Sequence, residues 1–284
     1  MPADADVTVL LTFDFCAISS QISLFQGRYS SQISHGEFAT IGVTRVLRVL
    51  ADHGAPATFF VPGHTALAYP EQVLALAEAG HEVGHHGWVH EVPSELTAQE
   101  EPRVFERGLA ALEQVLSARP TGYRAPGWSL SERTVEILLS HDFAYDSSMM
   151  ASDYHPYWCR VGDRAPLDEP FEFGREVPVV ELPVAWHLDD VPFFSFVMAP
   201  GGTFQGLRNP ADVHDIWRAE FDYLYREERH GILLLTMHPE VIGHGHRLPM
   251  LRRLLEHICA HDGVRFATCD AHAQRWRAGI ALPG

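Results

Sequence analysis

The stretch Val7-Thr8-Val9-Leu10-Leu11-Thr12-Phe13 is a continuous run of β-branched and large apolar residues that ends at Asp14. Such a run is typical of a strand that is buried on both faces. A second run, Ile232-Leu233-Leu234-Leu235-Thr236, leads into Met237-His238-Pro239, where the proline cannot continue a strand ladder. Strands of this kind belong to parallel sheets covered by helices, so the two runs indicate an α/β fold.

Strand and helix patterns alternate along the rest of the chain. Repeated strand–helix units predict a mostly parallel sheet with helices outside it. Residues 151–178 are rich in Pro, Asp and aromatic residues without a clear period, and we interpret them as an irregular insertion in a single domain spanning 1–284. The other predicted strands are 57–61, 122–124, 179–182 and 264–267, and the predicted helices are 70–79, 97–116, 131–139, 211–229 and 248–261, with one more near 43–50 and one at the C-terminus.

The composition excludes several classes of function. The 284 residues carry a formal net charge of −16, and all 21 basic residues are arginine, because the sequence contains no lysine. Proteins that bind nucleic acid or an anionic membrane surface need a basic face, so we expect neither partner. Lysine-dependent chemistry, such as a Schiff base or a P-loop, is ruled out.

The cysteine pattern and the absence of a recognisable targeting segment predict a cytoplasmic protein. The cysteines show neither C-x-x-C spacing nor a dense disulfide framework. No apolar run reaches the roughly 18 residues that a transmembrane helix needs, and the start of the sequence lacks the pattern of a signal peptide. We also expect a homo-oligomer that acts on a small-molecule or carbohydrate substrate.

Ionisable residues follow the ends of several predicted strands. In barrels and open α/β folds, the carboxyl ends of the strands are where active sites form. Several strand ends that each deliver such a group are a stronger signal than any one of them alone. The candidate site residues are Asp14, Cys16, His86, His90, Arg124, Asp189, Asp190 and His238.

The segment His86-Gly87-Trp88-Val89-His90 predicts a metal site. On a helical turn, two histidines four residues apart aim at one point, as a pair of metal ligands requires. Asp14 or Cys16 would complete a three-ligand site with a fourth position open for water. The alternative is that the pair arises by chance among 18 histidines, and that Cys16 is a small buried apolar residue.

The remaining candidates suit proton transfer. Histidine has an unperturbed pKa near neutrality, so His238 is a plausible general acid, although it could equally be a hydrogen-bonded structural residue. Arg124 could hold a carboxylate bidentately or form a surface ion pair, and Asp189 or Asp190 could orient an imidazole or cap a turn. Nearby aromatic residues could line a substrate pocket or pack in the core: Trp88, Trp128, Trp186, Phe193 and Phe194.

Taken in order, these motifs resemble the polysaccharide deacetylase (NodB-homology) family of carbohydrate esterases. The resemblance covers almost the whole chain and is closest to the cytoplasmic branch, with its peptidoglycan-deacetylase-like enzymes and metal-independent allantoinases. It implies a distorted (β/α) barrel of about seven strands and hydrolysis of a non-peptide C–N bond. The matching segments are Thr12-Phe13-Asp14, 84–91, 124–128, 181–190 and Thr236-Met237-His238-Pro239.

The resemblance also implies roles for the catalytic candidates. Asp14 matches the catalytic base of the family, and Arg124 matches the arginine that holds this base. His238 matches the general acid, and Asp189 or Asp190 is the residue expected to orient it.

The metal ligands are where this sequence departs from the family pattern. His86 and His90 match the two metal-ligand histidines, but Cys16 stands where the family has a second acidic ligand. A thiolate binds zinc well, so we expect one divalent metal, with Zn²⁺ as the first candidate. Asp14 could also become a ligand of this metal. Loss of metal, as in the allantoinase-like members, is the alternative.

Three functions follow from this resemblance. We expect N-deacetylation of an acetylated amino sugar or a related carbohydrate. The alternative is ring-opening hydrolysis of a cyclic amide, imide or ureide. A non-catalytic, ligand-binding member with a decayed site is the third possibility, and only the departure at Cys16 supports it.

Overall fold

The first apolar run forms the central strand of the structure, a computed structural model that describes residues 6–195, 197–199, 202–204 and 206–279. This strand, β1 (Asp6–Asp14), is buried from its second residue to its last. It pairs along its length with β10 (His230–Met237) and through its last three residues with β2 (Thr58–Val61). The two longest hydrophobic runs of the sequence are therefore neighbours in space.

The sheet curls into a half-barrel in which the order of strands is β10-β1-β2-β3-β4-β5-β7-β6. The ladders from β10 to β7 are parallel, and β11 (Val264–Ala267) pairs with the first half of β1. After β7, one bridge joins Asp189 to Thr236 of β10, so the chain returns to the first strand of the order. The distorted (β/α) barrel that the sequence predicts is confirmed. The shorter strands are β3 (Glu82–His85), β4 (Gly122–Tyr123) and β5 (Tyr145–Asp146).

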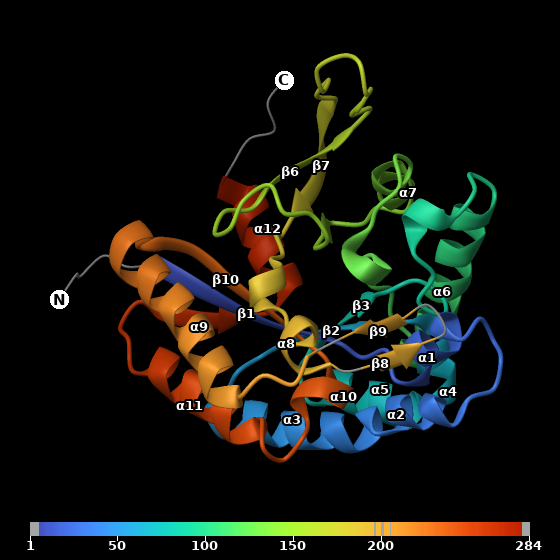
Figure 1. The fold of residues 1–284 in the computed structure, drawn as a ribbon. Helices are drawn as coiled ribbons and strands as arrows, with labels where there is room; N and C mark the ends of the chain where they lie inside the picture. The colour runs from blue at the N-terminus through green and yellow to red at the C-terminus, as the bar shows by residue number, and fades with distance from the viewer. Residues whose placement is uncertain (1–5, 196, 200–201, 205, 280–284) are drawn as a thin grey trace.

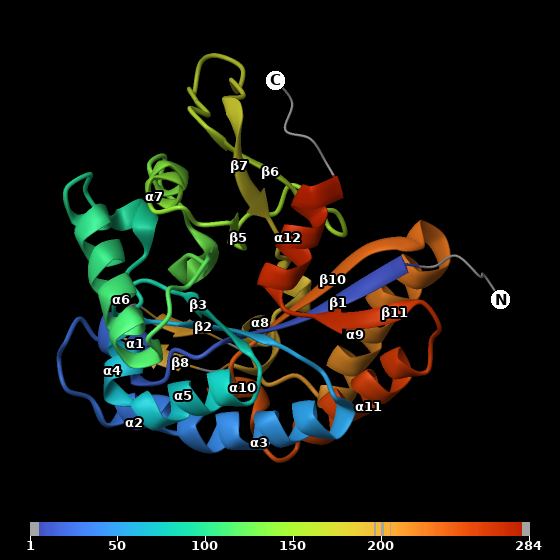
Figure 2. The ribbon, with the colours of Figure 1, turned by 180° about the vertical axis from the view of Figure 1, so that it is seen from behind.

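Helices surround the sheet (Figures 1 and 2). Their apolar faces pack against the strands, as Val43, Val46 and Leu50 of α3 do in the largest core cluster. Among the described helices, none is long and apolar enough to cross a membrane. The longer helices are α3 (Ala39–His53), α5 (Pro70–Glu78), α6 (Glu100–Leu116), α7 (Thr134–Ser140), α9 (Pro210–Tyr223), α11 (Leu248–Cys259) and α12 (Cys269–Gly279).

Short elements lie between these helices and strands. The segment predicted as one helix over 211–229 is α9 followed by a π-helical turn, Leu224–Glu228. The short helices are α1 (Ile18–Leu24), α2 (Ser34–Glu37), α4 (Gly63–Ala68), α8 (Val191–Phe194) and α10 (Pro239–Ile242), and β8 (Val197–Ala199) pairs with β9 (Gly202–Phe204).

The segment 151–178 is more regular than the sequence suggests. It contains β6 (Tyr157–Val161) and the start of β7 (Arg175–Glu181), which pair antiparallel. The two strands form a hairpin that projects from the body of the fold (Figure 1). The expectation of an irregular segment is wrong for these residues, because Trp158, Cys159 and Val161 supply a buried strand inside Pro- and Asp-rich surroundings.

Candidate active site

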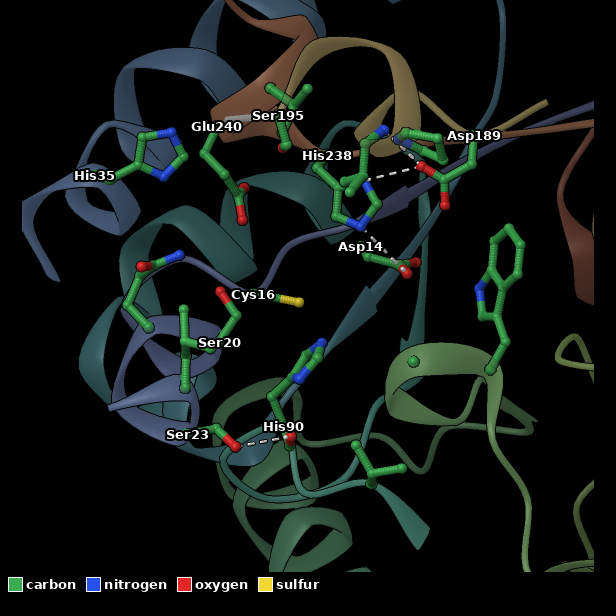
Figure 3. A pocket seen from close by; sticks show the side chains of 18 of the residues that line it. Asp14, Cys16, Ser20, Ser23, His35, His90, Asp189, Ser195, His238 and Glu240 are labelled. Atoms are coloured by element: carbon green, nitrogen blue, oxygen red, sulfur yellow. Dashed lines mark hydrogen bonds and ion pairs between the residues drawn. The ribbon is translucent and has the colours of Figure 1, made fainter. Parts of the chain in front are cut away.

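A cavity of about 730 Å³ opens at the carboxyl ends of β1 and β10 (Figure 3). Parallel strands of a barrel deliver their carboxyl ends to one face, which explains why residues far apart in the sequence meet there. Five of the eight candidate residues line the cavity, and the other three are buried and contact the lining residues. The lining residues are Asp14, Cys16, His90, Asp189 and His238, and those behind them are His86, Arg124 and Asp190.

Asp14 lies at the centre of the site. Its Oδ1 accepts a hydrogen bond of 2.8 Å from Nη1 of Arg124. Its Oδ2 lies 3.9 Å from Nε2 of His86 and 3.7 Å from Nε2 of His238. Burial alone would raise the pKa of Asp14, but the charge of Arg124, together with His86 and His238, holds this pKa below its usual value. Asp14 is therefore an ionised carboxylate whose second oxygen faces two imidazoles.

Arg124 is fully buried behind Asp14, and its guanidinium is held from several directions. Nη1 also donates to Oγ1 of Thr12 at 2.8 Å, while Nε and Nη2 donate to the carbonyl and the hydroxyl of Ser147 at 2.9 and 2.8 Å. The guanidinium stacks over the ring of Phe60 at 4.3 Å. The bidentate pair expected from the sequence is wrong: a single nitrogen contacts the carboxylate, because the other donors have partners in the neighbouring strand ends.

His238 follows β10 and is held by Asp190. Nδ1 of His238 donates to Oδ1 of Asp190 at 2.8 Å, and the backbone N–H of His238 donates to Oδ2 at 3.0 Å. Burial would lower the pKa of His238, but the charges of Asp190, Asp189 and Asp14 raise it to about 10. The imidazole is therefore protonated at neutral pH, and its Nε2–H faces the cavity beside Asp14.

Asp189 has a different environment from Asp190. Its Oδ1 accepts the backbone N–H of Val191 at 2.7 Å and lies 3.9 Å from Nδ1 of His238. Burial, partly offset by the charge of His238, raises the pKa of Asp189 to about 7. Asp189 thus caps the start of α8 and lines the cavity, while Asp190 makes the direct contacts to His238.

The two histidines of the predicted metal pair converge through an irregular turn rather than a helix. Gly87 has a φ of 72° and His90 a φ of 70°, and this left-handed backbone cannot continue a helix. Nδ1 of His85 accepts the N–H of Gly87 at 3.1 Å, and Glu91 accepts the N–H groups of Trp88 and Val89 at 3.2 and 2.7 Å. These side chains fix the turn, and the sequence spacing did not reveal their role.

The rings of His86 and His90 lie edge to face with their centroids 5.3 Å apart. Nδ1 of His86 donates to the carbonyl of Arg124 at 2.7 Å, which places the lone pair on Nε2. That Nε2 is buried and has no hydrogen-bond partner among the described residues. Burial lowers the pKa of both imidazoles, that of His90 to about 3, so both are neutral and able to ligate.

The thiol of Cys16 completes a group of donors that fits a divalent metal. One ligand atom each from Cys16, His86 and His90 lies within 4.8 Å of the others. Burial, together with Glu240 and Asp14, raises the pKa of Cys16 well above its usual value, so a bound cation is what would convert this thiol into a thiolate. A thiolate and two imidazoles form a donor set that Zn²⁺ accepts.

One residue of the cavity wall, Glu240, was not assigned from the sequence. Glu240, two residues after His238, is buried, and burial raises its pKa to about 7. Its position in the His-Pro-Glu motif was the available signal.

Two of the aromatic candidates lie on the cavity wall. The ring centroids of Trp128 and Trp186 are 4.3 Å apart there, and Trp186 is 50% exposed. Of the other aromatic candidates, Trp88 lies under Arg107 and Phe194 lies in the core.

Comparisons with known proteins show which family the chain belongs to. The sequence model for polysaccharide deacetylase matches residues 3–145. A peptidoglycan deacetylase of Helicobacter pylori is 36% identical over 275 residues, which cover 93% of this chain and 94% of that protein. The chain belongs to the polysaccharide deacetylase family. It is a hydrolytic enzyme of the N-deacetylating type, as the sequence predicts.

Solved structures show the same architecture. A structure from Mycobacterium smegmatis, described as a polysaccharide deacetylase, has a TM-score of 0.84 and 35% identity, with coverage of 100% of this chain and 96% of that one. The PuuE allantoinase has a TM-score of 0.80 but 21% identity, with coverage of 98% and 92%, and it shows the fold alone. Neither the ring-opening alternative nor the non-catalytic one gains support from these comparisons.

Proposed function

We propose that this enzyme removes the acetyl group from an N-acetylated amino sugar or a related carbohydrate, with Asp14 as general base and His238 as general acid. One observation carries the proposal. Oδ2 of Asp14 lies 3.9 Å from Nε2 of His86 and 3.7 Å from Nε2 of His238. A base, a proton donor and a group of metal-ligating side chains therefore meet at one end of the cavity.

Asp14 takes the proton of the attacking water. Arg124 keeps it ionised and occupies Oδ1, so that Oδ2 alone is directed to the cavity. A carboxylate held in one orientation is an efficient base because little reorganisation is needed when the proton moves.

His238 gives its proton to the leaving nitrogen. The amine is a poor leaving group until it is protonated, so a donor beside the scissile bond is required. Asp190 fixes Nδ1 as a hydrogen-bond donor and leaves Nε2–H directed to the cavity. Asp190 is thus a positioning residue that also keeps His238 charged.

The donor group Cys16, His86 and His90 would hold one divalent metal, with Zn²⁺ as the first candidate. When bound, Zn²⁺ supplies polarisation of the amide carbonyl and lowers the pKa of a bound water. His86 presents its Nε2 lone pair because the carbonyl of Arg124 fixes its tautomer. The requirement for metal is typical of polysaccharide deacetylases and supports this assignment.

The substrate class follows from the relatives and from the cavity. A relative that is 36% identical over nearly the whole chain is named a peptidoglycan deacetylase. Trp128 and Trp186 offer an apolar surface along one wall, and about 730 Å³ leaves room for a sugar ring with its acetamido group.

Acetate release tests this function. The purified enzyme is incubated with N-acetylated amino sugars and their oligomers, and separately with cyclic imides and ureides, each with and without a chelator. Metal content is measured on the same samples. The proposal predicts chelator-sensitive release of acetate from an acetylated sugar. Faster hydrolysis of a cyclic imide or ureide would overturn it.

We further propose that the enzyme works in the cytoplasm as a homo-oligomer. Light scattering after size-exclusion chromatography gives the mass in solution, and a mass equal to one chain of 31.8 kDa would contradict the second part. Fractionation of the source cells, with detection by antibody, tests the first part.

A further inference from the structure

Glu240 is a buried acid that the proposed chemistry does not use. It lies on α10, directly after His238-Pro239, and only 5% of its surface is exposed to solvent. It nevertheless lines the cavity. In Figure 3 its carboxylate points into the cavity from the same side as His35 and Ser195.

One oxygen of this carboxylate lacks a partner. Oε2 of Glu240 is buried and accepts no hydrogen bond from any described residue. Buried polar atoms are almost always paired, because leaving one unpaired forfeits the hydrogen bonds that it makes in water. Because the carboxylate as a whole lines the cavity, a donor brought by the substrate is the partner that would satisfy it.

The surroundings of Glu240 are polar. Ser20 and Gln21 of α1, His35 of α2 and Ser195 after α8 line the same cavity. These groups combine donors with acceptors, as hydroxyl groups require. Trp128 and Trp186 provide an aromatic surface elsewhere on the wall. The cavity therefore combines a polar surface with an aromatic one.

We propose that Glu240 is the centre of a hydroxyl-recognition subsite that accepts a hydrogen bond from a ring hydroxyl of the substrate. This inference rests on the proposed function and narrows it to polyhydroxylated N-acetyl amino sugars. A cyclic imide or ureide offers N–H groups but no ring hydroxyl, so deoxygenated sugars are the substrates that test hydroxyl recognition directly. Sites built to hydrogen-bond a substrate hydroxyl strongly reject analogues that lack it.

The test combines enzyme variants with deoxygenated substrates. Wild type, Glu240→Gln, Glu240→Leu and Glu240→Met are assayed for acetate release on the best acetylated amino sugar and on its monodeoxy derivatives, each lacking one ring hydroxyl. Glu78→Leu, which removes an exposed carboxylate on α5, is the matched control. Circular dichroism and thermal melting identify variants that do not fold, and Glu240→Met provides a second apolar replacement.

In wild type, one deoxy derivative should lose about tenfold or more in kcat/KM, the scale of one hydrogen bond to a charged or polar group. Glu240→Leu and Glu240→Met should lose a similar factor on the parent sugar, mainly through KM, and no further on that derivative. Glu240→Gln and Glu78→Leu should keep the discrimination.

Each other outcome overturns the inference. Equal kcat/KM for every deoxy derivative in wild type would show that no hydroxyl is recognised. Unchanged discrimination in both apolar variants would show that Glu240 is not the group that recognises it. In both cases acetate release by wild type would leave the proposed function standing, whereas no acetate release from any acetylated sugar would remove both.

Discussion

Asp190 binds His238 through both of its carboxylate oxygens. Oδ1 accepts from Nδ1–H at 2.8 Å and Oδ2 accepts from the backbone N–H at 3.0 Å. The ring orientation and the tautomer are therefore set by one residue, and Nε2 is left 3.7 Å from Oδ2 of Asp14. The sequence left open whether Asp189 or Asp190 orients the acid, and this geometry leads us to assign that role to Asp190.

The contact between Asp190 and His238 leads to a prediction for the basic limb of the pH–rate profile. The carboxylates raise the pKa of His238 to about 10, so the acid stays protonated through neutral pH and loses its proton as the pH rises through that value. In Asp190→Asn, the pKa should fall, and the basic limb of kcat should move to lower pH by more than about one unit. Asp189→Asn, the matched control, should shift the limb less. A limb unchanged in Asp190→Asn would contradict the role of Asp190.

Replacement of the acid tests the same part of the site. His238→Ala should lower the rate of acetate release at least about 100-fold, the usual scale of general acid catalysis. The fold should survive, since the imidazole is partly exposed to the cavity and not part of the core. Circular dichroism confirms folding, and a rate close to that of wild type would show that another group donates the proton.

Arg124 supports both stability and activity. In Arg124→Lys, one ammonium replaces a planar group that bonds Asp14, Thr12 and Ser147, and several buried acceptors lose their partners. The free energy of unfolding should fall by about 1–3 kcal/mol, and kcat should fall at least about tenfold. Denaturant melts and acetate assays measure the two effects. Wild-type values for both would contradict this account of Arg124.

The proposed metal site depends on Cys16 as its third ligand. Cys16→Ala should lose Zn²⁺ affinity markedly, because the thiolate is one of three expected ligands. Cys16→Asp should keep a metal and shift selectivity towards harder ions such as Mn²⁺. Elemental analysis after dialysis against each metal measures both effects. If Cys16→Ala retained Zn²⁺ as wild type does, Cys16 would be a small apolar residue rather than a ligand.

The sequence predicted the parts of this fold that depend on continuous apolar runs. β1 and β10 are long and buried on both faces, so their pattern is unambiguous, and the polar residues after them belong to the cavity. β5, with two residues, is too short to produce a pattern, and β6 is hidden because Pro and Asp residues surround its apolar core. Such strands depend on partners that are distant in sequence.

The same limit applies to the candidate site. The spacing of His86 and His90 suggested a convergent pair, but not the left-handed backbone at Gly87 and His90. The side chains of His85 and Glu91 accept N–H groups of this turn, and His85 is itself held by the carbonyl of Phe105, 20 residues away, at 3.0 Å. The different roles of the neighbouring residues Asp189 and Asp190 also cannot be predicted from the sequence. They depend on which carboxylate oxygen reaches which hydrogen-bond donor in three dimensions.

The central claim is that Asp14 acts as the base beside the metal ligands rather than as one of them. The direct measurement is acetate release by Asp14→Asn on the best acetylated sugar, with bound metal measured in the same preparation. The account predicts a loss of at least about 100-fold in rate with the metal content of wild type. A rate within about threefold of wild type, or loss of the metal, would contradict it.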